Sequence, residues 1–144
     1  MTKQKKPPVP LSGIIYGEIV YWITIFSAVI VILGTVKTFL EPDSSLPPAY
    51  ILEAVLSGQS VSSIWVGTEI GGVPEAHWYF SFMSSGEGLT TAGLALGVFS
   101  IIPATIVTSL FLWRSRNEFF AGLALAAAII TVTSMTGIIP LPIG

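Results

Sequence analysis

Three long windows of the 144-residue sequence contain no Asp, Glu, Lys or Arg. They run from Ile19 to Val36, from Gly88 to Trp113 and from Phe119 to Gly144, and together they make up almost half of the chain. A helix needs roughly 20 apolar residues to cross the hydrocarbon layer of a bilayer, which is about 30 Å thick. The windows therefore predict three membrane-spanning helices and exclude a water-soluble fold.

The composition excludes most cofactor chemistry. The chain has no cysteine and one histidine, so we expect no disulfide, no thiolate metal site and no haem held between two of its own imidazoles. The net charge of −2 is too small to indicate nucleic acid or another charged ligand. No nucleophile beside a base, no phosphate loop and no paired carboxylates occur in the spans. We therefore expect bound lipid, no cofactor from this chain and no enzyme activity of the chain alone.

The sequence predicts one membrane domain over residues 1–144. Its three transmembrane helices are expected at about residues 13–40, 86–113 and 119–139. The first segment exceeds the 7 to 15 apolar residues of a secretory signal, so we interpret it as a membrane helix. A long connection over residues 41–78 joins the first two helices. The expected fold class is an all-α membrane protein.

This connection is predicted to carry a short helix from Ala49 to Ser57, which Ser44 or Ser45 can cap and Gly58 ends. Apolar side chains recur four residues apart along it, which indicates an interfacial helix lying on the membrane surface. Packing as a cap over the other helices is the alternative, and the two placements are compatible.

The basic residues predict the orientation, because short loops rich in Lys and Arg stay on the cytoplasmic side. Five of the six basic residues lie in the first six residues or in the turn between the last two helices, namely Lys3, Lys5, Lys6, Arg114 and Arg116. A three-span path brings both groups to one face. We therefore expect a cytoplasmic N-terminus, with the long connection and the C-terminus outside.

Small residues mark the expected helix contacts, because helices in lipid associate through close backbone approach and interhelical hydrogen bonds. The second helix carries a small-residue stripe that includes the GxxxG pair Gly93 and Gly97, followed by Ser100 and Ala104. The third helix carries Gly122 and Ala126 in the same register. We favour contact between these two helices within the chain, and an oligomer or partner interface is the alternative. Pro103 is expected to bend the second helix by freeing the carbonyl of Phe99.

Apart from Glu87 at the very start of the second span, Glu18 is the one carboxylate within a predicted span, and such a group costs ~2.5 to 3.5 kcal/mol at the bilayer centre. Because Glu18 lies only a turn or two into the first helix, we favour an interfacial or intersubunit ion pair over a proton-relay site. Lys37, at the other end of this helix, is interpreted as an anchor that reaches the interface. Glu87 is expected to gain from the helix dipole at the start of the second span.

The outer connection brings Glu69, Glu75 and His77 within nine residues. Carboxylate and imidazole groups are ligands of divalent metals, so these residues are a candidate metal site. Their spacing matches no established signature, and we favour an interfacial hydrogen-bonding role for His77.

The segment from Gly97 to Met135 follows the pattern Gly-x5-Pro-Ala-x7-Leu-Trp-Arg-Ser-Arg-Asn-Glu-Phe-Phe. It resembles a family of small three-helix membrane proteins of unknown function from bacteria and archaea, which often lie beside genes for TauE/SafE-type anion permeases. The matching positions, which cover the C-terminal third of the chain, are Gly97, Pro103, Arg114, Arg116 and Glu118. The resemblance implies a prokaryotic cell membrane, the inner membrane where there are two, and carries no activity.

Three functions are compatible with these features. We favour a non-catalytic accessory subunit of a larger integral membrane complex, with a respiratory or redox complex as a host class. A small transporter or permease-associated component is the alternative, with a path lined by Glu18, Thr131, Ser134 and Thr136. The third is an outward metal or ligand sensor built on the connection. All three require membrane lipid, and the first requires other membrane subunits as partners.

Overall fold

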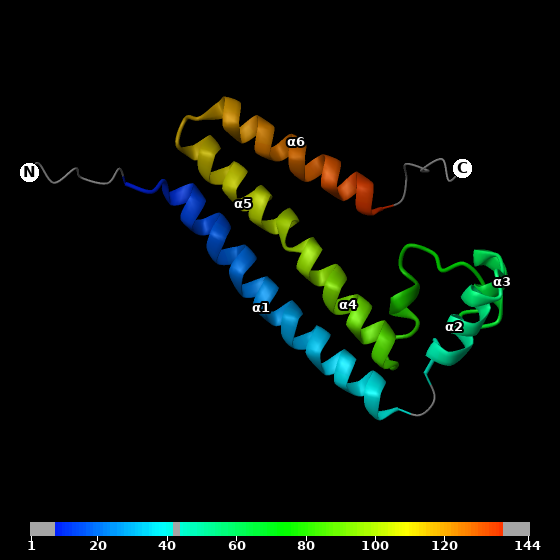
Figure 1. Ribbon diagram of the computed structural model, residues 1–144. Helices are drawn as coiled ribbons and strands as arrows, with labels where there is room; N and C mark the ends of the chain where they lie inside the picture. The colour runs from blue at the N-terminus through cyan, green and yellow to red at the C-terminus, as the bar shows by residue number, and fades with distance from the viewer. Residues whose placement is uncertain (1–7, 42–43, 137–144) are drawn as a thin grey trace, which may run out of the picture. The chain divides into compact units, whose positions relative to one another are not determined.

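In the computed structural model, which describes residues 8–41 and 44–136, every regular element is helical and no strand occurs in these ranges (Figure 1). The elements in chain order are α1 (Leu11–Leu40), α2 (Pro48–Leu56), α3 (Val61–Val66), the 3-10 helix η1 (Trp78–Phe80), α4 (Gly86–Phe99), α5 (Ile101–Arg114) and α6 (Glu118–Met135). Three stretches are long and apolar enough to cross a membrane: α1, the run from α4 through α5, and α6. The all-helical expectation and the number of candidate spans are confirmed.

The chain forms two compact units. The first, which we call the hairpin unit, comprises the residues up to Thr24 and those from Val98 onward, and thus holds the start of α1 with α5 and α6. The second, which we call the central unit, is Ile25–Gly97 and holds the rest of α1 with α2, α3 and α4. Each unit has its own buried contacts, described separately below.

The start of α1 follows directly from a proline. The carbonyl of Pro10 accepts hydrogen bonds from the backbone N–H groups of Gly13 at 3.0 Å and Ile14 at 3.3 Å, which sets the first turn. A proline before a helix costs no intrahelical bond, because the first N–H groups have no acceptor there. The helix therefore begins two residues before its predicted start and ends at Leu40, as expected.

The second span is interrupted at Ser100, between α4 and α5. Pro103 has no N–H to donate to the carbonyl of Phe99, and its ring crowds that carbonyl. The next helical hydrogen bond, from Ala104 N–H to Ser100 O, is long at 3.4 Å. The regular helix is therefore interrupted one turn before the proline, although Ser100 keeps right-handed helical backbone angles, with φ of −55° and ψ of −28°. The bend itself stays a prediction.

A three-residue turn, Ser115–Asn117, joins α5 to α6 in the hairpin unit. Arg116 adopts a left-handed backbone conformation with φ of 59°, and the N–H of Asn117 donates to Leu112 O at 3.0 Å. Helix α6 begins at Glu118, one residue before its predicted start. Its predicted end at residue 139 lies outside the described residues.

The connection in the central unit holds the predicted short helix as α2. Gly58 ends it with a φ of +73°, and the N–H of Gln59 donates back to Ala54 O at 3.1 Å. This pairing closes the helix end in a Schellman motif, which favours glycine at the left-handed position. Neither predicted serine caps the start, where Pro47 is the N-cap residue without a side-chain bond.

The apolar run after Gly58 is a second short helix, α3, which the sequence analysis did not separate from the connection. The side chain of Ser60 caps α3 by accepting a hydrogen bond from Ser63 N–H at 3.3 Å. The hydroxyl of Tyr50 donates to the carbonyl of Ile64 at 3.3 Å, which ties α2 to α3. The connection is therefore an ordered pair of short helices.

Candidate functional site

The predicted GxxxG pair of α4 lies against α1 in the central unit. A Cβ atom added to Gly93 would stand 2.8 Å from Val31 Cγ2, and one added to Gly97 would stand 2.8 Å from Ser27 Oγ. On the other helix, a Cβ atom on Gly34 would stand 2.5 Å from the backbone nitrogen of Thr90. At Gly34 the two backbones therefore approach closely enough that only glycine fits, whereas at Gly93 and Gly97 an added Cβ atom would first meet side chains of α1.

These contacts form one antiparallel seam. Along α1 the contacting residues are Ser27, Val31, Gly34 and Thr38, and their opposing residues on α4 are Gly97, Gly93, Thr90 and Gly86. The steps of four, three and four residues are heptad spacing, which keeps one face of each helix toward the other. Ser27 adds a buried hydrogen bond, because its hydroxyl donates to Gly93 O at 2.6 Å. We call this face the glycine seam.

The helix that meets the small residues of α4 is thus the first one, whereas the sequence analysis favoured the third. The reason lies in α1, where Ser27 and Gly34 fall at the same heptad spacing as the glycines of α4 and are both buried. Those two residues were the available signal in the sequence.

The hairpin unit has a different contact between α5 and α6. Ala104 of α5 is buried, and so are Ala121 and Ala128 of α6. The hydroxyl of Ser109 is buried and donates to Ala121 O at 2.8 Å. Ser100, also a predicted packing residue, is 2% exposed in the same unit. The hydroxyl-to-carbonyl bond of Ser109 therefore ties α5 to α6, and the buried positions of α6 are alanines.

Gly122 and Ala126, the predicted packing pair of the third helix, lie outside this contact. Both residues are exposed. A Cβ atom added to Gly122 would meet no described atom within 4 Å, apart from the backbone of its own helix and its two chain neighbours. The buried positions of α6 are Ala121 and Ala128, one residue before Gly122 and two after Ala126. Because α6 is apolar all round, its hydrophobic pattern does not distinguish one face from another.

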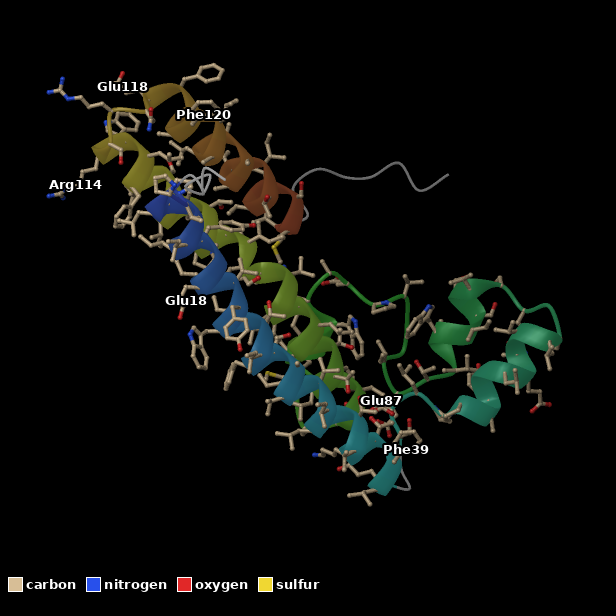
Figure 2. The ribbon with its side chains drawn as sticks, turned by 60° about the vertical axis from the view of Figure 1, so that its left-hand side comes forward. Glu18, Phe39, Glu87, Arg114, Glu118 and Phe120 are labelled. Carbon is tan, nitrogen blue, oxygen red and sulfur yellow. The ribbon has the colours of Figure 1, made fainter. Side chains whose placement is uncertain are left out.

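Glu18 lies on the exposed side of α1, within the hairpin unit (Figure 2). Its Oε1 atom accepts a hydrogen bond from the indole Nε1–H of Trp22 at 2.9 Å, one helical turn further on. Seven residues separate Glu18 from the start of α1, which corresponds to roughly 10 Å along the helix axis. The carboxylate is therefore held by a neighbour on its own helix and remains accessible to another group.

A polar cluster closes the end of the glycine seam. Lys37 donates to the backbone carbonyl of Ser84 and forms an ion pair with Glu41, with Nζ 3.2 Å from Oε1. The hydroxyl of Ser44 donates to the carboxylate of Glu87 in the first turn of α4. Lys37 and Glu87 are thus engaged within the central unit, and the lysine ties α1 to the start of α4.

Glu69, Glu75 and His77 do not form a metal site in the described part of the chain, where no three His, Asp or Glu side chains gather in a suitable cluster. The three side chains are exposed. His77 instead lies beside aromatic rings, with centroids 6.2 Å from Tyr79 and 6.0 Å from Phe80. Nearness in sequence did not bring the three side chains together into a cluster that could hold a metal.

Two of the three hydroxyls proposed for a transport path donate to carbonyls of their own segment. Thr131 donates to Ala127 O at 2.8 Å, and Thr136 donates to Thr133 O at 2.9 Å. Ser134 is exposed. In α5, by contrast, the buried hydroxyl of Thr108 has no hydrogen-bond partner among the described residues. Hydroxyls bonded to their own backbone are a common way to satisfy polar groups within a membrane helix.

Comparison with known proteins places the chain beside others whose activity is not defined. The model of an uncharacterised family matches residues 12–138, well beyond the C-terminal third on which the resemblance in sequence was based. An uncharacterised protein of Archaeoglobus fulgidus is 29% identical over 109 residues, which are 75% of this chain and 71% of that protein. No solved structure matches. These findings show no link to TauE/SafE-type permeases.

Proposed function

Since the chain belongs to this uncharacterised family, we propose from its own surfaces that it is a non-catalytic accessory subunit of a larger integral membrane complex. It lies in the cell membrane of a prokaryote, with its N-terminus in the cytoplasm and its C-terminus outside. A respiratory or redox complex is the host class we favour. The three apolar stretches support the membrane location by length and composition.

The observation that carries the proposal is the small-residue pair on α6. Gly122 and Ala126 are four residues apart, and both are exposed. Association in lipid depends on close packing at small residues, since lipid tails are as apolar as leucine. The glycines of α4 already contact α1, whereas a Cβ atom on Gly122 would meet nothing within 4 Å in the described structure, and Ala126 is exposed. A helix of another subunit would pack against this exposed pair.

Glu18 supplies a second contact for such a partner. An accessible carboxylate on an apolar helix is costly in lipid unless it reaches the interface or pairs with an opposite charge. Trp22 satisfies one oxygen of this carboxylate without neutralising its charge. A lysine or arginine on a neighbouring subunit would do so.

Substitutions of two alanines that are adjacent in the sequence test the proposal. Ala126→Leu places a large side chain on the exposed small-residue face, and Ala127→Leu places the same side chain about 100° further round the helix. Both alanines are exposed. Protein solubilised gently from its own host membrane is analysed by native mass spectrometry. We expect Ala126→Leu to reduce the assembled fraction at least about tenfold, a change of about 1.4 kcal/mol, and Ala127→Leu to leave it within about twofold.

A lone monomer of the unmodified chain with full helix content would contradict the proposal. In a parallel arm, Glu18→Gln is expected to weaken assembly, because the charge that a partner cation would pair with is lost. Loss of solute flux with assembly intact would instead support the transport alternative.

A further inference from the structure

The hairpin unit contains a half-open hollow of about 290 Å³. It lies where the first turn of α1 meets the last turn of α5 and the turn that leads into α6. Its apolar wall is formed by Pro10, Leu11, Phe111 and Leu112. The hollow therefore lies where two apolar helices end, at the level at which a span passes into the headgroup region.

The rest of the lining is polar, with a positive charge. Ser12, Arg114, Ser115 and Asn117 line it, and none of its eight lining residues is acidic. The first backbone N–H group that donates to Pro10 O is that of Gly13, so the N–H groups of residues 11 and 12 lie before the helical hydrogen-bond pattern begins. The N-terminal turn of a long helix adds partial positive charge. Both the side chains and the backbone thus favour an anion.

We propose that this hollow binds the phosphate headgroup of an anionic phospholipid. Arg114, whose place at the end of α5 is labelled in Figure 2, pairs with the phosphate through its guanidinium N–H groups. Ser12 and Asn117 hydrogen-bond the polar part of the headgroup, and the wall of Leu11, Phe111 and Leu112 contacts the glycerol and the first acyl methylenes.

A phospholipid fits both halves of this lining, whereas a free phosphate ion fits only the polar half. The apolar wall would stay in contact with water if the ligand were a small soluble anion, which gains nothing from apolar surface. The inference uses the membrane location of the proposed function and is independent of the accessory role.

Two neighbouring arginines provide the test. Arg114 lines the hollow and Arg116 does not, although they lie two residues apart, at the end of α5 and in the turn that follows, and carry the same charge. The full-length protein is reconstituted into phosphatidylcholine vesicles with increasing phosphatidylglycerol, in 0.15 M salt, where the Debye length is about 8 Å. Retained lipid is counted by native mass spectrometry after transfer to detergent, and helix content is measured in parallel.

We expect one phosphatidylglycerol to be retained in preference to phosphatidylcholine, with affinity falling about five- to tenfold in Arg114→Gln and less than about twofold in Arg116→Gln. Ser12→Leu fills the hollow without changing the charge and is expected to remove the retained lipid. Equal effects of the two arginine variants, equal retention of both lipids, or complete displacement by inorganic phosphate would overturn the lipid site. Failure to enter the vesicles would instead overturn the membrane location.

Discussion

The two units join their helices by different means. In the central unit, glycines of α1 and α4 lie in the contact, and Gly34 is close against the backbone of Thr90, whereas in the hairpin unit the buried residues of α6 are alanines. Both contacts include a buried serine that donates to a carbonyl of the opposite helix, Ser27 to Gly93 O and Ser109 to Ala121 O. The hydrogen bond is shared, and the small residues beside it differ.

The connections between the helices suggest a reason for this difference. Three residues join α5 to α6, whereas 45 residues, from 41 to 85, lie between α1 and α4. If both connections were flexible loops of these lengths, closing the longer one would cost about 2.4 kcal/mol more in chain entropy. The short turn thus favours the hairpin by itself, and the glycine seam supplies extra contact where the connection supplies little.

The largest expected effect is at the glycine seam. In Gly34→Ala the new Cβ atom meets the backbone of Thr90 at 2.5 Å, which neither helix can relieve by rotating a side chain. We expect the free energy of unfolding to fall by about 2 to 3 kcal/mol, at the upper end for overpacking. Reversible unfolding in mixed micelles, followed by circular dichroism, measures it.

Gly17→Ala is the matched control on the same helix, because its Cβ atom meets nothing within 4 Å in the described structure. Alanine is the better helix former, by roughly 0.5 to 1 kcal/mol, so this variant is expected to be neutral or slightly more stable. Equal destabilisation of the two variants would remove the distinction between a seam and an ordinary helix face.

An intermediate effect is expected in the hairpin unit, where two adjacent hydroxyls differ in their bonding. Ser109→Ala removes the bond to Ala121 O, and interhelical bonds of this kind average about 0.6 kcal/mol with a maximum of about 1.7. Thr108→Val removes a buried hydroxyl that has no partner among the described residues. We therefore expect Ser109→Ala to lower the free energy of unfolding and Thr108→Val to leave it unchanged or raise it, in the same micelle assay. A loss in Thr108→Val as large as that in Ser109→Ala would show that the bond is not what distinguishes them.

No loss of stability is expected at Gly122, where an added Cβ atom finds open space. As for Gly17→Ala, Gly122→Ala should leave the free energy of unfolding of the isolated chain unchanged or raise it by up to about 1 kcal/mol, because alanine is the better helix former. Micelle unfolding beside Gly34→Ala provides the measurement. A loss comparable to that of Gly34→Ala would mean that α6 packs on this face within the chain, which leaves no room there for a partner.

The sequence predicted the positions of the helices better than it predicted which helices pack against one another. Runs without charge located the three candidate spans, and Gly58 located the end of α2 to within one residue. Both signals are local, because a charge or a left-handed glycine acts on its own segment. The contact of Gly93 with α1 depends on residues far away in the sequence, and its signal, the heptad spacing of Ser27 and Gly34, lies in α1 and not beside Gly93.

Two further differences between the predicted and the observed structure also concern contacts that the local sequence does not determine. The face of α6 that is buried against α5 has no sequence signature, because apolar residues surround the helix and only the size of Ala121 and Ala128 distinguishes it. The predicted ligands Glu69, Glu75 and His77 were grouped by spacing alone, and the loop does not gather them into a metal cluster in the described residues. Glu18 was located correctly on its helix, and its bond to Trp22 follows from the separation of four residues.

Arg116, in the turn between α5 and α6, combines an unfavourable backbone conformation with a positive charge. Arg116 holds a left-handed backbone conformation that costs a side-chain-bearing residue roughly 1 to 2 kcal/mol and that glycine would adopt freely. The chain instead carries an arginine there, which in the orientation proposed above is one of the basic residues that keep a short loop on the cytoplasmic side. Under that proposal, the strained backbone of the turn and a charge that orients the helices belong to the same residue.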